Sequence, residues 1–196
     1  MLQGNPSPVL ILGSKSPRRS QLLREAGFEF EIRVQDSDEA FELSMPSLQV
    51  AEFLARVKAT ELKHTLSTHE VLLTADSVVI LDGLIYNKPS DYGEGIAMLS
   101  ALSGRTHTVA TGVSISTLTT EKSFTVTTDV TFDKITSSEM DYYLRHFHPY
   151  DKAGAYGIQD WIGWCKINRI EGSYSNVMGL PVREVYLGLQ EFGITI

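Results

Sequence analysis

The sequence lacks the features that mark secreted, membrane-embedded or nucleic-acid-binding proteins. It has one cysteine, Cys165, so no intramolecular disulfide can form, which is typical of a protein from a reducing compartment. No apolar run approaches the ~20 residues that a membrane-spanning helix needs. The first residues lack the charged segment and the apolar run of a signal peptide. We therefore expect a cytoplasmic protein that has no membrane partner.

Positive charge is also scarce. Lys and Arg number 17 against 24 Asp and Glu, and the formal net charge is −7. Because nucleic-acid binding depends on neutralising phosphates with Lys and Arg, we expect no nucleic-acid partner. A local group of basic residues can still bind a small anion. The length of 196 residues, with 42% hydrophobic and 21% charged residues, is ordinary for one globular domain, here expected over 1–196.

The hydrophobic pattern predicts an α/β fold with a mixed sheet. Strands are expected over 8–13, 28–34, 71–81, 107–118, 122–132 and 165–172, and helices over 16–27, 46–64, 95–104, 136–147 and 181–193. The dipeptide Asp82-Gly83 between apolar runs predicts a hairpin. Residues 150–164 are expected to form a glycine-containing functional loop.

The segment GSKSPRRS (13–20) joins a strand to a helix that begins with Arg18 and Arg19. Free backbone N–H groups and the helix dipole favour an anion there, so arginines have the wrong sign for that position. A bound phosphate would explain them, since Arg binds phosphate oxygens in a bidentate way. The alternative is two solvated arginines. The segment lacks the glycine and lysine spacing of a P-loop.

Asp76 lies in the middle of the apolar stretch VLLTADSVVIL (71–81). A carboxylate among apolar residues is costly unless it is paired or binds a metal. Two interpretations stay open: a structural Asp paired with a Lys, or a metal ligand or general base at a cleft.

Other charged residues can complete such a site. Lys58, Lys88 and Lys152 are candidate cations, although each alone is typical of a surface lysine. Asp38 and Glu39 lie in an acidic loop and are a second source of carboxylates for Mg²⁺. Together these residues indicate a hydrolase or transferase that acts on phosphate esters.

Several segments resemble one known family. GSKSPRRSQLLREAGF resembles the S-x-S-P-R-R-x-x-L-L opening of the Maf family. Other blocks are similar in family order over about residues 10–185: VKATEL, TADSVV, NKP, AMLSALSGRTHTVATGVSI, YDKAGAYGIQ and IEGSYSNVMGLPV. The resemblance implies a Maf/ITPase-like fold, in which an elongated, twisted mixed sheet is flanked by helices and two lobes enclose a deep central cleft.

The resemblance also implies an activity, the hydrolysis of a nucleoside triphosphate to a monophosphate and pyrophosphate with Mg²⁺ or Mn²⁺. The family's proton acceptor matches Asp76, which would also bind the metal together with Glu39 of the Asp38-Glu39 pair. Its phosphate-binding residues match Ser14, Arg18, Arg19, Lys58 and Lys88.

The same resemblance implies which nucleotides are the substrates. Arg18 and Gln159 match the branch of the family that acts on dTTP and UTP, and Ser77 lies at a third specificity position, where Thr is usual. Asn87 and Asp160 replace glycines of the family pattern. Two alternatives remain: a nucleotide-binding regulator of cell division and septum formation with incidental catalysis, and a phosphatase that releases orthophosphate. The sequence is compatible with a homodimer and does not require one.

Overall fold

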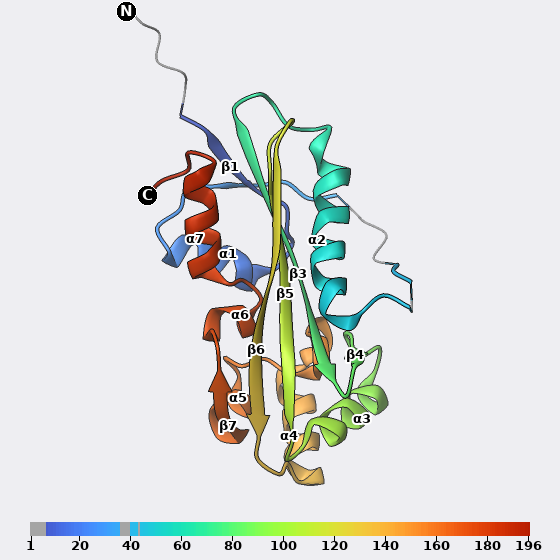
Figure 1. Ribbon diagram of the computed structural model, residues 1–196. Helices are drawn as coiled ribbons and strands as arrows, with labels where there is room; N and C mark the ends of the chain where they lie inside the picture. The colour runs from blue at the N-terminus through green and yellow to red at the C-terminus, as the bar shows by residue number, and fades with distance from the viewer. Residues whose placement is uncertain (1–6, 36–39, 43) are drawn as a thin grey trace, which may run out of the picture.

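A computed structural model of the chain describes residues 7–35, 40–42 and 44–196. One seven-stranded sheet runs through it in the order β2-β1-β3-β5-β6-β7, with β4 paired to β3 (Figure 1). The strands are β1 (Val9–Leu12), β2 (Glu31–Ile32), β3 (Glu70–Leu81), β4 (Leu84–Tyr86), β5 (Thr106–Ser116), β6 (Glu121–Phe132) and β7 (Ile167–Glu171). Pairing is parallel among β2, β1 and β3 and antiparallel elsewhere, so the predicted mixed α/β class is confirmed.

Helices flank the sheet on several sides. They are α1 (Pro17–Glu25), α2 (Ser47–Lys63), α3 (Tyr92–Leu102), α4 (Ser137–Phe147), α5 (Trp161–Lys166), α6 (Tyr174–Met178) and α7 (Val182–Glu191), with 3₁₀ turns η1 (Pro149–Asp151) and η2 (Ala153–Ala155). In Figure 1, α2 follows the long strands on one side, α1 and α7 lie near one end, and α3 and α4 lie at the other. In the described ranges, every helix is too short or too polar to cross a membrane.

The long strand β3 contributes to several hydrophobic clusters, two of which lie along its two halves. Val71 and Leu73 pack with residues of α1 and α7, whereas Val79 and Leu81 pack with residues of α3 and α4. Asp76 lies between these two apolar stretches of the strand. The carboxylate is therefore placed where the strand passes from one packed region to the next.

Local sequence signals explain most element boundaries. Asp82 and Gly83 both have positive φ, 53° and 79°, as the predicted tight hairpin between β3 and β4 requires. The helix α4 has the predicted capping box between Thr136 and Glu139. Both features are set by residues that are close together in the sequence.

Four elements differ from the prediction: two in their bounds, and two that were not predicted as helices. The strand expected over 28–34 shrinks to two residues, Glu31–Ile32. Helix α3 begins at Tyr92 rather than residue 95, because the Asp91 side chain caps it by accepting from the Glu94 N–H. The segment expected as a loop contains α5, and α6 was not predicted. Both helices are too short, at six and five residues, to show a helical period.

Candidate active site

A cavity of about 850 Å³ lies where the β1–α1 turn, α2, the middle of β3 and the segment after α4 meet. Its lining includes every predicted site residue that the structure describes: Ser14, Arg18, Arg19, Lys58, Asp76, Ser77, Lys88 and Gln159. Lys152, a candidate cation, lines it as well. The predicted metal ligand Glu39 and its neighbour Asp38 lie outside the described residues.

One side of the cavity is the turn wall, residues 13–19. Helix α1 begins there, and its N-cap Ser16 accepts a hydrogen bond from the Arg19 N–H. Ser14 is buried, and its Oγ accepts from the Ser16 N–H. Gly13 makes the tight approach possible, since a Cβ there would lie 2.7 Å from the Thr74 side chain. The wall thus directs a helix N-terminus at the cavity, as an anion site requires.

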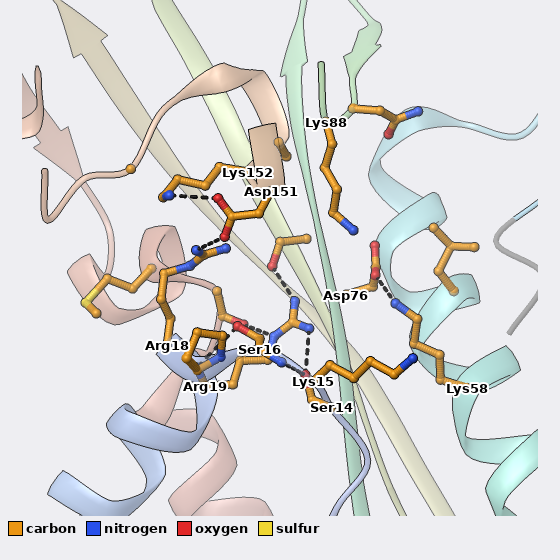
Figure 2. Close-up of a pocket in the computed structure, with 18 of the residues that line it drawn as sticks. Ser14, Lys15, Ser16, Arg18, Arg19, Lys58, Asp76, Lys88, Asp151 and Lys152 are labelled. Atoms are coloured by element: carbon orange, nitrogen blue, oxygen red, sulfur yellow. Dashed lines mark hydrogen bonds and ion pairs between the residues drawn. The ribbon is translucent and has the colours of Figure 1, made fainter. Parts of the chain in front are cut away.

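Arg19 is fixed by three elements at once. Its Nε donates to the Gly179 carbonyl at 2.8 Å, and its terminal nitrogens donate to Ser77 Oγ at 3.1 Å and Ser14 Oγ at 3.3 Å (Figure 2). Gly179, at φ 117°, ends α6 and turns its carbonyl toward the guanidinium. The arginine therefore links the turn wall, β3 and the end of α6 in one orientation.

Asp76 is paired with a lysine and also lines the cavity. Its side chain is 14% exposed and forms an ion pair with Lys58 of α2, whose side chain is 16% exposed. The same carboxylate also lines the cavity, and Lys88 extends toward it from the far side (Figure 2). The aspartate is thus paired and also available to a ligand.

Gly112 explains how α2 comes close enough for this pair. Gly112 is the register partner of Asp76 on β5. A Cβ at Gly112 would collide with the backbone of Ala51 and Glu52, so α2 packs directly against the strand backbone there. The sequence offered no sign of this contact, because it depends on two segments about 60 residues apart.

Behind the cavity, Ser77 is held by buried polar residues that the sequence did not indicate. Ser77 Oγ lies 2.9 Å from Thr111 Oγ1, which donates to the Asn176 carbonyl at 3.1 Å. The buried Asn176 side chain in turn donates to the Val109 carbonyl and to Thr128 Oγ1. These bonds tie Ser77, the predicted specificity position on β3, to β5, β6 and α6.

The opposite side of the cavity is the loop wall, residues 149–160. Asp151 accepts from Arg18 at 2.7 Å and from Lys152 at 2.8 Å. Burial raises the pKa of the Asp151 carboxyl, but the hydrogen bonds from Lys152 and Arg18 outweigh this effect and leave the pKa below its ordinary value. The ionised Asp151 therefore bridges the loop wall and the turn wall.

Gln159 belongs to the loop wall and has a side-chain acceptor that is not used within the described residues. Its side chain lines the cavity, and its Oε1 is buried and accepts no hydrogen bond within the described part of the chain. A buried amide oxygen without a donor is costly, and a ligand N–H would relieve that cost.

Comparisons with known proteins agree with the resemblance. The family model described as "Maf-like protein" matches residues 9–192. A dTTP/UTP pyrophosphatase from Porphyromonas gingivalis (strain ATCC BAA-308 / W83) is 46% identical over 98% of each chain. One from Parabacteroides distasonis is 42% identical over 98% of this chain and 100% of its own.

Among solved structures, the Staphylococcus aureus Ham1 protein is similar over 63% of this chain and 71% of its own, with 15% identity and a TM-score of 0.47. That similarity is too low to bear on the assignment, which depends on the family model and the curated relatives. On both of these grounds, the chain belongs to the Maf family.

Proposed function

We propose that this protein hydrolyses dTTP and UTP to the nucleoside monophosphate and pyrophosphate. The observation that carries the proposal is the position of Asp76, which lines the same cavity as the arginine-bearing turn wall. The curated relatives named dTTP/UTP pyrophosphatase support the same reaction.

Asp76 serves as the proton acceptor in this proposal. Water attacks the α-phosphorus, and the proton passes to the carboxylate oxygen that is not bonded to Lys58. The Lys58 ammonium holds the other oxygen and so orients the carboxylate. A positioned base of this kind contributes roughly 10²- to 10⁴-fold to the rate.

The turn wall holds the triphosphate in this proposal. The N-terminal N–H groups of α1, the Ser14 hydroxyl and Arg19 bind phosphate oxygens, because each presents a donor to the cavity. Lys58 and Lys88 extend from the other side and stabilise the negative charge that develops on the leaving pyrophosphate.

The carboxylates fit a hard divalent cation. Mg²⁺ and Mn²⁺ prefer oxygen ligands, and Mg²⁺ is usually bound by one or two carboxylates together with substrate phosphates. Within the described ranges no group of three or more His, Cys, Asp or Glu could hold a metal ion by itself. Asp76 and Glu39 would hold the ion. When bound, it polarises a phosphate oxygen as a Lewis acid.

The base is selected by Gln159, Arg18 and Ser77 in this proposal. The unpartnered Gln159 Oε1 accepts the N3–H of thymine or uracil, while Nε2 donates to a ring carbonyl. Cytosine has no hydrogen at N3 and cannot satisfy the buried oxygen. A site built to pair a ligand N–H rejects an analogue that lacks it, which explains a preference for thymine and uracil.

We further propose that residues 1–196 act as one Maf-like domain in the cytoplasm, with two lobes that share the sheet. The two hydrophobic clusters joined by β3 and the single, exposed Cys165 support these two statements. A homodimer remains a prediction, which the mass of the purified protein in solution tests.

The experiment measures pyrophosphate and orthophosphate released from dTTP, UTP, CTP, dATP and GTP with Mg²⁺. We expect pyrophosphate from dTTP and UTP, loss of activity with a chelator, and recovery when Mg²⁺ is restored. Asp76→Asn should lower turnover roughly 10²- to 10⁴-fold.

Asp82→Asn is the matched control, because it makes the same exchange in the exposed hairpin turn at the end of β3. Equal turnover by Asp76→Asn and the wild type would overturn the role of Asp76. Release of orthophosphate would indicate a phosphatase, and tight binding without turnover would indicate a regulator.

A further inference from the structure

Asp160 is a mostly buried carboxylate that the proposed reaction does not use. The family resemblance gave glycine as the usual residue at this position. Here the side chain is only 16% exposed, and Oδ2 accepts a hydrogen bond from the Tyr143 hydroxyl at 2.7 Å. The same oxygen lies 3.9 Å from Lys152 Nζ. A mostly buried acid with two such partners points to a defined structural task.

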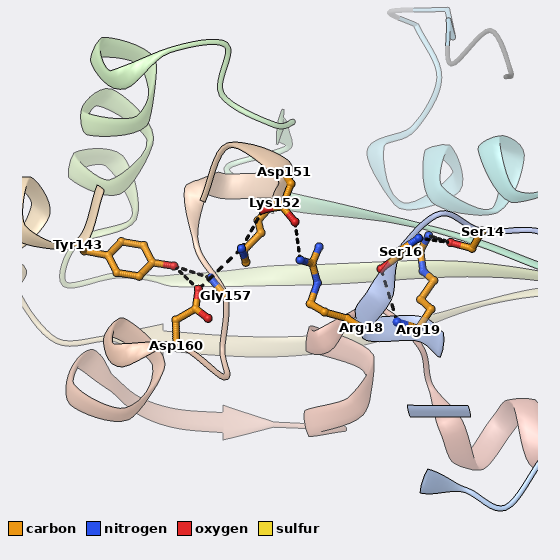
Figure 3. A network of polar contacts seen from close by, with 9 residues as sticks. All are labelled: Ser14, Ser16, Arg18, Arg19, Tyr143, Asp151, Lys152, Gly157 and Asp160. Atoms are coloured by element: carbon orange, nitrogen blue, oxygen red, sulfur yellow. Dashed lines mark hydrogen bonds and ion pairs between the residues drawn. The ribbon is translucent and has the colours of Figure 1, made fainter. Parts of the chain in front are cut away.

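From Asp160 a chain of polar contacts leads to the cavity. Lys152 Nζ donates to Asp151 at 2.8 Å, and Asp151 accepts from Arg18 at 2.7 Å (Figure 3). Tyr143, at the other end, is completely buried in α4. The five residues therefore connect the core beneath α4 to an arginine on the turn wall, and each carboxylate lies between two donors.

The backbone is shaped around the Asp160 carboxylate. The Gly157 N–H donates to Tyr143 Oη at 3.0 Å. A Cβ at Gly157 would lie 2.6 Å from Asp160 Oδ2 and 3.0 Å from the Lys152 side chain. The loop wall thus leaves room for Asp160 and Lys152 only because residue 157 has no side chain.

The hydrogen-bond directions within the chain are well defined. Burial raises the pKa of Tyr143 far above its ordinary value, and the bond to Asp160 raises it further, so the hydroxyl keeps its proton and donates. The Tyr174 hydroxyl responds in the same way, since burial and the negative charge of Asp160 both raise its pKa.

Lys152 is shared between two acids, and this sharing affects Arg18. The Lys152 side chain is 13% exposed and lies between Asp151 and Asp160. If Asp160 loses its charge, the lysine has Asp151 as its remaining acid. Lys152 bonds Asp151 Oδ1 and Arg18 bonds Asp151 Oδ2, so a change in how Lys152 is held between the two acids changes how Asp151 holds Arg18.

We propose that Asp160 is a positioning residue which, through Lys152 and Asp151, sets the orientation of Arg18 and so strengthens nucleotide binding. The inference rests on the proposed function, because it assigns Arg18 to the nucleotide site. Asp160 would then influence nucleotide binding although it is not among the residues that line the cavity.

The test is a double-mutant cycle between Asp160→Asn and Arg18→Ala. We expect Asp160→Asn alone to raise the KM for dTTP and UTP about five- to tenfold and to change kcat less than about threefold. In the Arg18→Ala background, the same change should alter KM less than about twofold. A merely structural role predicts equal effects in both backgrounds, and that result, or an unchanged KM in Asp160→Asn, overturns the proposal.

Two further variants keep the cycle informative. Tyr143→Phe keeps the ring in the core and removes only the hydroxyl, so a rise in KM of about two- to threefold is expected, smaller than for Asp160→Asn because the carboxylate remains. It takes the place of Asp160→Asn in the cycle if that variant fails to fold. Asp133→Asn is the matched control, because Asp133 is exposed and bonds to Asn168, and its KM should equal that of the wild type.

A binding measurement separates this inference from the proposed function. Trp161 directly follows Asp160, and with the exposed Trp164 replaced by Phe it is the single tryptophan reporter for a dTTP titration. If the effects of the two variants on dTTP affinity are coupled but no pyrophosphate is released, only the proposed reaction is overturned. Pyrophosphate release with additive effects of the two variants would overturn only the role of Asp160.

Discussion

On the turn wall, Arg19 is fixed by a backbone carbonyl and two hydroxyls, next to the start of a helix. On the loop wall, the Asp151 carboxylate binds Lys152 and also reaches across the cavity to Arg18, which lies 133 positions earlier in the chain. The first arrangement presents donors whose geometry depends on the main chain. The second depends on a balance of side-chain charges. The difference suggests that the turn wall provides binding common to all triphosphates and the loop wall provides discrimination among them.

The largest effect is expected on the turn wall. Arg19→Lys keeps the charge but loses the planar set of donors to Gly179, Ser77 and Ser14. We expect pyrophosphate release to fall about 100-fold, equivalent to roughly 3 kcal/mol, and by the same factor for every nucleotide. Arg24→Lys, at an exposed position on the same helix, is the control. A loss confined to one nucleotide would contradict the assignment of the turn wall to the phosphates.

A second prediction concerns His107, which lies beneath the loop wall. Its Nε2 lies 2.7 Å from Tyr156 Oη, and burial lowers its pKa to about 4, although the charge of Asp129 acts in the opposite direction. In the unfolded chain the pKa is about 6.5, so the unfolded state binds more protons between these values. As far as His107 is concerned, the free energy of unfolding should therefore be highest above pH 6.5. It should fall by on the order of 3 kcal/mol as the pH drops toward 4.

Urea unfolding measured from pH 4 to 8 checks this prediction. His107→Gln should remove most of the decrease, whereas His146→Gln, at an exposed position on α4, should leave it unchanged. An equally steep decrease in His107→Gln would show that other groups cause the pH dependence.

The third prediction tests the loop wall for base discrimination. Gln159→Glu removes the amide donor and places a negative charge beside the base. We expect the ratio of kcat/KM for dTTP to that for CTP to fall about tenfold, or roughly 1.4 kcal/mol. Arg19→Lys, on the opposite wall, should leave this ratio unchanged. If both variants change the ratio equally, phosphate binding and base discrimination are not separated between the two walls.

The smallest effect is expected away from both walls. Arg105 and Asp82 form an ion pair at 2.7 Å, but their side chains are 45% and 65% exposed. Exposed pairs contribute roughly 0–1 kcal/mol, so Arg105→Ala should change stability by less than about 1 kcal/mol and leave turnover unchanged. Thermal unfolding and the pyrophosphate assay measure both.

The turn wall was open to prediction because its residues are neighbours in the sequence. Ser14, Arg18 and Arg19 lie within six positions, and Asp76 is conspicuous among apolar residues. The hairpin at Asp82-Gly83 depends on two adjacent residues and was also predicted. Such features follow from local steric and electrostatic preferences.

The loop wall depends on distant pairs, so its partners were not found. Asp151 reads as an ordinary loop acid, and Tyr143 as a core residue of α4, until the fold brings them to Arg18 and Asp160. Thr111 and Asn176 were missed for the same reason. Glu39 remains a prediction, because it lies outside the described residues.

The absence of a side chain at Gly112 affects the distance between Lys58 and Asp76. Since α2 rests on the strand there, the absence of a side chain determines how far Lys58 stands from the carboxylate on the neighbouring strand. Even a methyl group at position 112 would lift the helix and lengthen that separation without altering either charged residue. An uncharged position without a side chain thus controls the spacing of the ion pair between Lys58 and Asp76.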